Sequence, residues 1–165
     1  MVVVSDTSPL SNLAIIGRLD LVRGQFGLVL VPSAVRRELM RLEHGAASDL
    51  LDAAFNDGWL QVTPLLQAVP GNLSAGLHAG EAEALALALE HRADFTLLDD
   101  GDARRRAMDA GLRISGALGI LLRAKREGEI PSFRNEIRRL RNEAHFFIAP
   151  RLERELIAAA GEIPE

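Results

Sequence analysis

Short apolar runs that each lead into an acidic residue limit most strongly how this chain can fold. The runs and the acids that follow them are Val2 to Val4 with Asp6, Leu28 to Val31 with Glu38, and Phe95 to Leu98 with Asp99 and Asp100. A further acid, Glu81, opens a helical stretch of Ala and Leu. Because the carboxyl ends of parallel strands meet at one edge of a sheet, this pattern predicts a cluster of carboxylates at that edge.

Such a cluster requires positive charge nearby. Carboxylates brought within a few ångströms of one another repel and raise one another's pKa unless a cation lies between them. The chain has no cysteine, and its four histidines show no ligand spacing. Hard oxygen ligands favour Mg²⁺ or Mn²⁺ over zinc, so one of these two ions is the expected cofactor.

Strands and helices are predicted to alternate along the chain. Apolar runs predict strands at 2–5, 28–31, 60–63, 95–98 and 112–115, and helical patterns predict helices near 9–16, 33–43, 80–91, 102–110 and 118–126. Residues 64–73 contain two prolines and a Gly-Asn pair and are predicted to form a loop. This alternation is typical of an α/β fold with a mainly parallel sheet.

Length and composition predict one domain with a helical extension. A chain of 165 residues, 48% of them hydrophobic, can bury one core but is too short for two independent domains. After Gly128 the sequence no longer alternates between strand and helix patterns and predicts helices only. We therefore predict an α/β domain over 1–128 and helices over 129–165 that pack on it. Within the extension, residues 146–148 are apolar and are expected to pack on the core, with a partner or dimer surface as the alternative.

Charge and apolar stretches restrict the setting in which the protein works. The net charge of -4 argues against a strongly basic coat for nucleic acid but is compatible with an acidic pocket. No apolar stretch reaches the roughly 20 residues that span a bilayer, and the N-terminus lacks the pattern of a secretory signal. We therefore expect a cytoplasmic protein that does not use a membrane.

Asp6 and Glu38 each allow two interpretations. Asp6 ends the first predicted strand, where Thr7 and Ser8 beside it are placed to orient its carboxylate or a water molecule, but an ordinary turn Asp would look the same. Glu38 falls within the apolar stripe of its helix, where an unpaired carboxylate is costly to bury. Pairing with Arg41 at the edge of the stripe is the structural alternative.

Glu81 and the acids after residue 98 allow similar alternatives. Glu81 lies in the first turn of its helix, where acids commonly complement the helix dipole. Asp99, Asp100 and Asp102 lie together at a strand end, and the Asp-Gly pair there is also a turn signal. Asp99 is the favoured main ligand, and Asp100 or Asp102 is the accessory one.

Several short motifs together resemble one known family. They are Ser5 to Leu10, Val31 to Val35 with Glu38-Leu39, Gly58 to Leu60, Gly80 to Ala84, Leu97 to Asp100 with Ala103-Arg104, Ser115 to Gly119, and the tail that ends Ala160-Gly161-Glu162. In their order and spacing these motifs look like the PIN-domain ribonucleases, and most like the VapC-like branch. The resemblance covers nearly the whole chain.

The resemblance implies a fold and an activity. It implies a PIN-like three-layer α/β/α fold with a five-stranded parallel sheet of order 3-2-1-4-5 and a C-terminal helical extension. Asp6 and Asp99 would then lie on adjacent central strands, with Glu38 and Glu81 delivered by helices. It further implies hydrolysis of RNA phosphodiester bonds with Mg²⁺ or Mn²⁺, a toxin role, a small antitoxin partner that masks the site, and a homodimer.

The resemblance also assigns roles to individual residues. The residues expected to act in catalysis are Asp6, Glu38, Glu81 and Asp99. The same four and Asp100 are the expected metal ligands, with the register between Asp99 and Asp100 open. The residues expected to position the ligands or contact phosphate are Thr7, Ser8, Asp102, Arg104 and Ser115.

Two other functions fit parts of the same pattern. A catalytically inactive PIN-like module that only binds a partner protein would keep the acidic cluster as a docking surface. A Mg²⁺-dependent phosphotransfer domain also uses acids at strand ends, but it needs a Lys after a later strand, and the only Lys here, Lys125, falls at a helix end. We expect the nuclease over both.

Overall fold

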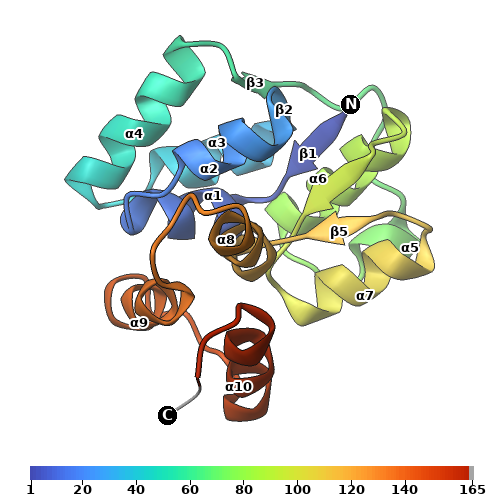
Figure 1. The fold of residues 1–165 in the computed structure, drawn as a ribbon. Helices are drawn as coiled ribbons and strands as arrows, with labels where there is room; N and C mark the ends of the chain where they lie inside the picture. The colour runs from blue at the N-terminus through green and yellow to red at the C-terminus, as the bar shows by residue number, and fades with distance from the viewer. Residues whose placement is uncertain (164–165) are drawn as a thin grey trace.

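A five-stranded parallel sheet in the order β3-β2-β1-β4-β5 forms the centre of the molecule, as shown by a computed structural model that describes residues 1–163 (Figure 1). The strands are β1 Val3–Ser5, β2 Val29–Val31, β3 Leu60–Val62, β4 Phe95–Leu97 and β5 Ile114–Ser115. β1 pairs with both β2 and β4, so the strand order reverses at β1. The predicted fold class and strand order are confirmed.

Helices connect the strands and cover the sheet. They are α1 Thr7–Ile15, α2 Asp20–Phe26, α3 Ser33–Met40, α4 Gly45–Asn56, α5 Gly71–Ser74, α6 Ala79–Glu90, α7 Gly101–Asp109, α8 Ala117–Arg126, α9 Phe133–Glu143 and α10 Pro150–Ala159. None of the helices formed by residues 1–163 combines the length and the apolar character that crossing a bilayer requires.

The buried apolar residues form three clusters, and two of them contain neighbouring residues of β1. Val3 packs in the larger core with residues of α1, α2, α4 and α8, including Leu13 and Ile120. The next residue, Val4, packs in a smaller core with Ala84 and Leu87 of α6. Because successive strand residues point to opposite faces, this switch between neighbours shows a helical layer on each face of the sheet.

Helix α6 consists almost entirely of Ala and Leu because it is surrounded on most sides. Its central residues from Ala84 to Ala88 are all buried, and the helix packs against α3, β1 and β4. Its burial fixes the position of its first turn, which carries Glu81, at the carboxyl edge of the sheet.

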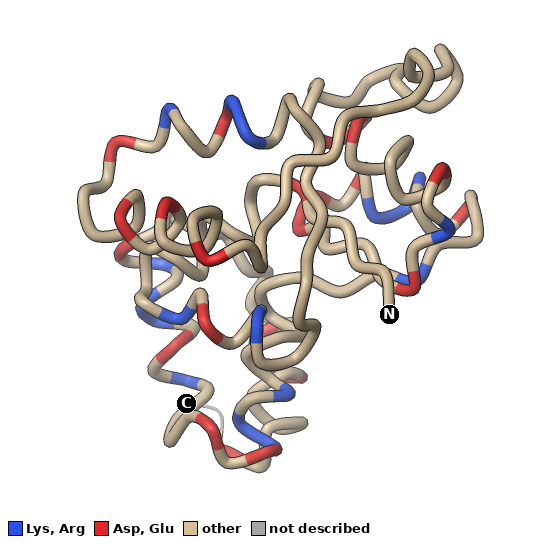
Figure 2. Tube along the Cα trace, turned by 90° about the horizontal axis from the view of Figure 1, so that it is seen from above, with Lys and Arg blue, Asp and Glu red and all other residues tan. Residues whose placement is uncertain are grey.

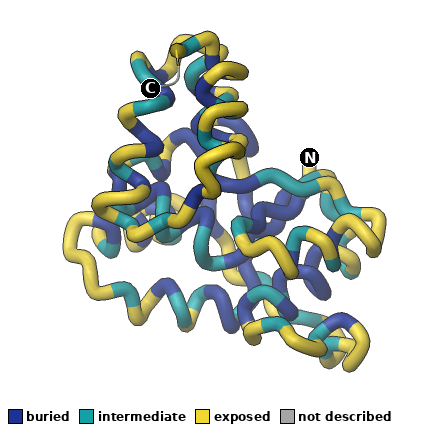
Figure 3. Tube along the Cα trace, turned by 90° about the horizontal axis from the view of Figure 1, so that it is seen from below, coloured by how far each residue is buried: buried dark blue, intermediate teal, exposed yellow. Residues whose placement is uncertain are grey.

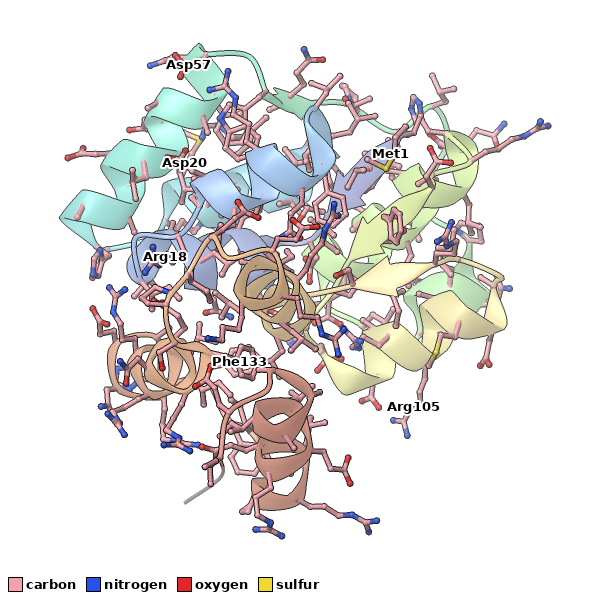
Figure 4. The ribbon with its side chains drawn as sticks, in the orientation of Figure 1. Met1, Arg18, Asp20, Asp57, Arg105 and Phe133 are labelled. Atoms are coloured by element: carbon pink, nitrogen blue, oxygen red, sulfur yellow. The ribbon has the colours of Figure 1, made fainter. Side chains whose placement is uncertain are left out.

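Helices α9 and α10 form a lobe beside α8 (Figures 1 and 3). Phe133 is fully buried in the larger core and lies inside this lobe in Figure 4. Arg18, just after α1, forms a 2.7 Å ion pair with the buried Glu136 of α9. Acidic and basic positions are interspersed along the chain of the lobe (Figure 2), and Arg139 and Glu143 form an ion pair there. The lobe therefore shares the core of the α/β part.

Three helices were not predicted from the sequence: α2, α4 and α5. Helix α4 carries a buried stripe of Ala47, Leu51 and Ala54, and His44 caps it by accepting a 3.1 Å hydrogen bond from the Ala47 N–H through Nδ1. The stripe has helical spacing, so the signal was present in the sequence. Helix α5 is a single turn that begins within the predicted loop 64–73 and ends one residue beyond it, and α3 ends at Met40, three residues earlier than expected.

Candidate active site at the carboxyl edge of the sheet

Asp6 lies at the centre of the site. It follows β1 directly and precedes α1, and its backbone N–H donates to the Leu97 carbonyl at 3.0 Å, which continues the ladder between β1 and β4. The residue is only 4% exposed. Burial, and after it the negative charges of Glu81, Glu38 and Asp99, raise the pKa of Asp6 from 3.8 to about 7, against an opposing hydrogen bond from the Thr7 backbone.

Glu38 is held beside Asp6 by two contacts. The hydroxyl of Thr7 donates to Glu38 Oε2. Gly80 in the first turn of α6 lies so close that a Cβ there would be 2.7 Å from Glu38 Oε1 and 2.8 Å from Oε2. Thr7 and Gly80 therefore fix the carboxylate from two different elements, and the apolar stripe of α3 directs it inward.

Glu81 enters the site from the N-terminal turn of α6. Burial is the largest cause that raises the pKa of Glu81. The negative charge of Asp100 raises it further and that of Glu38 does so less strongly, while His78 lowers it. His78 is the residue immediately before the helix. Glu81 lines the same pocket as Asp6 and Glu38, and its pKa also responds to the charge of Asp100.

Asp99 follows β4 and is held tightly. Its Oδ1 accepts a 2.8 Å hydrogen bond from the Ala117 N–H at the start of α8, and its Oδ2 accepts one of 3.3 Å from the Asn12 side chain. A Cβ on Gly116 would lie 2.6 Å from Asp99 Oδ1. Burial raises the pKa of Asp99, and these hydrogen bonds together with Arg104 counteract the effect.

Asp100 and Asp102 have different surroundings. Asp100 caps α7 by accepting a 3.0 Å hydrogen bond from the Ala103 N–H, and its charge still reaches Glu81. Asp102 is exposed and pairs with Arg105 along the outer side of α7. In Figure 4 Arg105 points away from the body of the molecule. The structure thus brings Asp100 to the cluster and leaves Asp102 outside it.

Arg104 and Ser115 lie on the Asp99 side of the site. Arg104 donates to the Leu98 carbonyl at 2.7 Å, so it holds the end of β4. Arg104 and Ser115 both line a pocket of about 460 Å³ that also includes Asp99. Both residues are therefore beside the cluster rather than within it.

Ser8 joins two pockets at the edge of the sheet. One pocket, of about 380 Å³, is lined by Asp6, Thr7, Ser8, Glu38, His78, Ala79 and Glu81. The other, of about 300 Å³, is lined by Ser8, Asn12, Asp99, Asp100 and residues 144–147. The carboxylate cluster, meaning Asp6, Glu38, Glu81, Asp99 and Asp100, is thus open to solvent on both sides of Ser8.

The donor set of the carboxylate cluster fits a divalent cation. Asp6 is buried, the negative charges of Glu81, Glu38 and Asp99 all raise its pKa, and the donors that these four residues offer are carboxylate oxygens. Among residues 1–163, no three Asp, Glu or His side chains converge closely enough to hold one ion by themselves. Mg²⁺ is usually held by one or two carboxylates and keeps several water ligands, so pairs from this cluster suffice.

Three parts of the site were missed by sequence reasoning. Asn12, which holds Asp99, follows Ser8 by one helical turn on α1, and this spacing was the available signal. Gly116 makes room for Asp99 across a gap in sequence that no local pattern reveals. Residues 144–147 reach the second pocket from the C-terminal lobe, and only the fold brings them there.

Comparison with known proteins gives one finding. The profile of a family described as DUF3368, a PIN domain, matches residues 2–162, which takes in both the sheet and the C-terminal lobe. No curated protein matches the chain.

Proposed function

This chain belongs to the PIN-domain family, whose members are typically nucleases, and on that premise we propose that it is a metal-dependent endoribonuclease. The observation that carries the proposal is the environment of Asp6. Its carboxylate is buried beside Glu38, Glu81 and Asp99, and its pKa is raised to about 7. A protein gains nothing in stability from such repulsion, so the arrangement is best explained by a cation and an anionic substrate.

The residues of the cluster divide into two groups around Ser8. Asp6, Glu38 and Glu81 would hold Mg²⁺ or Mn²⁺ on one side, and Asp99 with Asp100 on the other. A bound ion of this kind lowers the pKa of a coordinated water and stabilises charge that develops on a phosphodiester. The protein contributes fixed geometry: Thr7 orients Glu38, and Asn12 with Ala117 N–H orients Asp99.

We further propose the partners that membership of the family suggests. RNA is the substrate, the protein acts as the toxin of a toxin–antitoxin pair, and a small antitoxin masks the carboxylate cluster. The protein works in the cytoplasm as a homodimer. These assignments rest on the resemblance to VapC-like proteins, and the open, acidic pockets beside Ser8 are compatible with them.

Two alternatives are distinguished by particular residues. The lack of three convergent ligands among residues 1–163 is the observation that favours an inactive protein-binding module. Phosphotransfer has less support, because Lys125 donates to the Pro131 carbonyl at 3.0 Å, lies 3.9 Å from Glu162 and lines neither pocket of the cluster.

Cleavage of a labelled single-stranded RNA of mixed sequence tests the proposal. Wild-type protein is incubated with Mg²⁺ or Mn²⁺, or with EDTA, beside Asp6→Asn and the control Asp20→Asn. Asp20, labelled in Figure 4, is exposed on α2 and lines neither pocket. Cutting that requires the ion, is lost in Asp6→Asn and persists in Asp20→Asn supports the proposal. Intact RNA with correctly folded wild-type protein contradicts it and favours the binding module.

A further inference from the structure

The segment between α9 and α10 presents an aromatic ring to solvent from a fixed backbone. Phe147 is 84% exposed, whereas the next residue, Ile148, is 5% exposed and belongs to the larger core. Phe146 packs partly against the same core, and its N–H donates to the Leu140 carbonyl at 3.1 Å. The exposed ring therefore lies between a partly buried neighbour, Phe146, and a buried one, Ile148.

His145 makes the turn that leads to this ring. It has a φ of 53°, a left-handed conformation that residues other than glycine seldom adopt. The turn ends α9 and directs the chain back towards the sheet. An exposed Phe on a well-anchored turn gains nothing for folding, because its apolar surface remains in water.

Phe147 lines two pockets, one more polar and one more apolar, and Asp99 lines both. In the 300 Å³ pocket the ring is accompanied by polar groups of Ser8, Asn12 and His145. In the 460 Å³ pocket it is accompanied by Leu118 and other apolar side chains. The two pockets share Phe146, Phe147 and Asp99, so the ring stands at the junction between them.

We propose that Phe147 stacks on an unpaired base of the RNA strand whose phosphodiester lies over the carboxylate cluster. The inference rests on the proposed nuclease function and names the form of its substrate. Unpaired bases are recognised by stacking on aromatic rings and by hydrogen bonds to their edges, and Ser8, Asn12 and His145 offer such hydrogen bonds beside the ring. The substrate is therefore single-stranded at the nucleotide that Phe147 contacts.

A nucleobase fits this place better than a protein segment. The pocket that is lined by Asp99 and Asp100 combines two aromatic residues, Phe146 and Phe147, with several hydrogen-bonding side chains, which matches the flat face and polar edge of a base. It also lies next to the pocket that contains Asp6, because Ser8 lines both. One extended strand can therefore occupy both pockets.

Fluorescence of RNA containing 2-aminopurine tests the stacking without requiring cleavage. The fluorescent base is placed at each position of a short single strand in turn, and binding is measured with Asp6→Asn protein so that the RNA stays intact. Stacking quenches the fluorescence at one position. Adding Phe147→Ala to this protein should abolish that quenching and weaken binding about tenfold, while Phe147→Trp should retain both.

A matched control is Leu66→Ala, which also truncates an exposed apolar side chain. Leu66 is 83% exposed, and its N–H is bonded to Glu90, at the opposite end of α6 from Glu81. This control should leave quenching and affinity unchanged. Loss of quenching in the control equal to that in Phe147→Ala would overturn the inference.

Kinetics with otherwise unmodified protein separate this inference from the proposed function. If Phe147 acts by stacking, Phe147→Ala raises the KM for RNA about tenfold and changes kcat little. If cleavage requires the ion, Phe147→Ala leaves the KM unchanged and no position is quenched, the nuclease proposal holds and the stacking proposal is overturned. The stacking proposal is also overturned if Phe147→Ala impairs only association with a protein. Phe147-dependent quenching without cleavage supports the stacking while the nuclease proposal fails.

Discussion

Gly80 and Glu38 are in direct contact across the packed pair α3 and α6. A Cβ on Gly80 would lie 2.7 Å from Glu38 Oε1, 2.8 Å from Oε2 and 3.0 Å from Cδ. No side chain fits between the first turn of α6 and this carboxylate. The glycine that precedes Glu81 thus sets the separation between two of the proposed cation ligands.

Replacing Gly80 should affect activity far more than stability. In Gly80→Ala the new methyl group must displace the Glu38 carboxylate, which is the mobile end of a long side chain, so the fold adjusts easily. We expect a change of less than about 1 kcal/mol in the free energy of unfolding and a roughly 10- to 100-fold loss of RNA cleavage. Thermal denaturation and initial cleavage rates measure the two effects.

Gly45→Ala is the matched control for this change. Gly45 also lies in the first turn of a helix, α4, and a Cβ there meets nothing within 4 Å. Its cleavage rate should equal that of the wild type. Equal rates for Gly80→Ala and Gly45→Ala would show that the position of Glu38 is unimportant.

Gly116→Ala should reduce stability as well as activity. A Cβ there would lie 2.6 Å from Asp99 Oδ1 and 2.7 Å from the Leu98 carbonyl oxygen, and the backbone oxygen cannot turn away as a side chain can. We expect a loss of about 1–3 kcal/mol in the free energy of unfolding, measured by urea denaturation. Gly101→Ala, where a Cβ meets open space, is the control. Equal denaturation midpoints for the two variants would contradict the close contact.

The raised pKa of Asp6 predicts how stability depends on pH when no divalent ion is present. The folded protein holds the Asp6 proton up to a pKa of about 7, while the unfolded chain releases it near 3.8. Because the folded state binds more protons between these values, the free energy of unfolding falls as pH rises from about 4 through 7. Melting in EDTA should therefore occur at lower temperature at pH 8 than at pH 5.

Asp6→Asn should reduce this dependence, since Asn carries no charge, while Glu81 and Asp99, whose pKa values are also raised, keep the remainder. The variant should be more stable than the wild type at pH 8 in EDTA, by about 2–4 kcal/mol. Asp20→Asn, on the surface of α2, should retain the wild-type profile. A wild-type profile in Asp6→Asn would show that another group causes the dependence.

The central strands were predictable because β1, β2 and β4 are short, mostly apolar and largely buried, whereas the strand order came from the resemblance to PIN domains. The helices were harder to predict. Helix α4 was missed although Ala47, Leu51 and Ala54 have helical spacing, because small Ala residues give a weak apolar signal. Its N-terminal cap, the His44 side chain, is not a residue that sequence rules associate with this role.

The candidate site was predictable in its acids and less so in their supports. Strand ends and helix starts indicated Asp6, Glu81 and Asp99, because parallel strands bring these positions together. Asn12 and the loop with Phe147 reach the site through packing of elements distant in sequence. Such contacts depend on the three-dimensional arrangement, which local patterns do not encode.

Binding of Mn²⁺ to wild-type protein and to Asp6→Asn, followed by the electron paramagnetic resonance signal of free Mn²⁺, tests the central claim most directly. The carboxylate cluster should bind Mn²⁺ in the wild type, and the loss of the buried Asp6 charge should weaken binding by more than about tenfold. Equal affinity in the two proteins, or no binding by the wild type, would contradict the assignment of this cluster as the cation site of a ribonuclease.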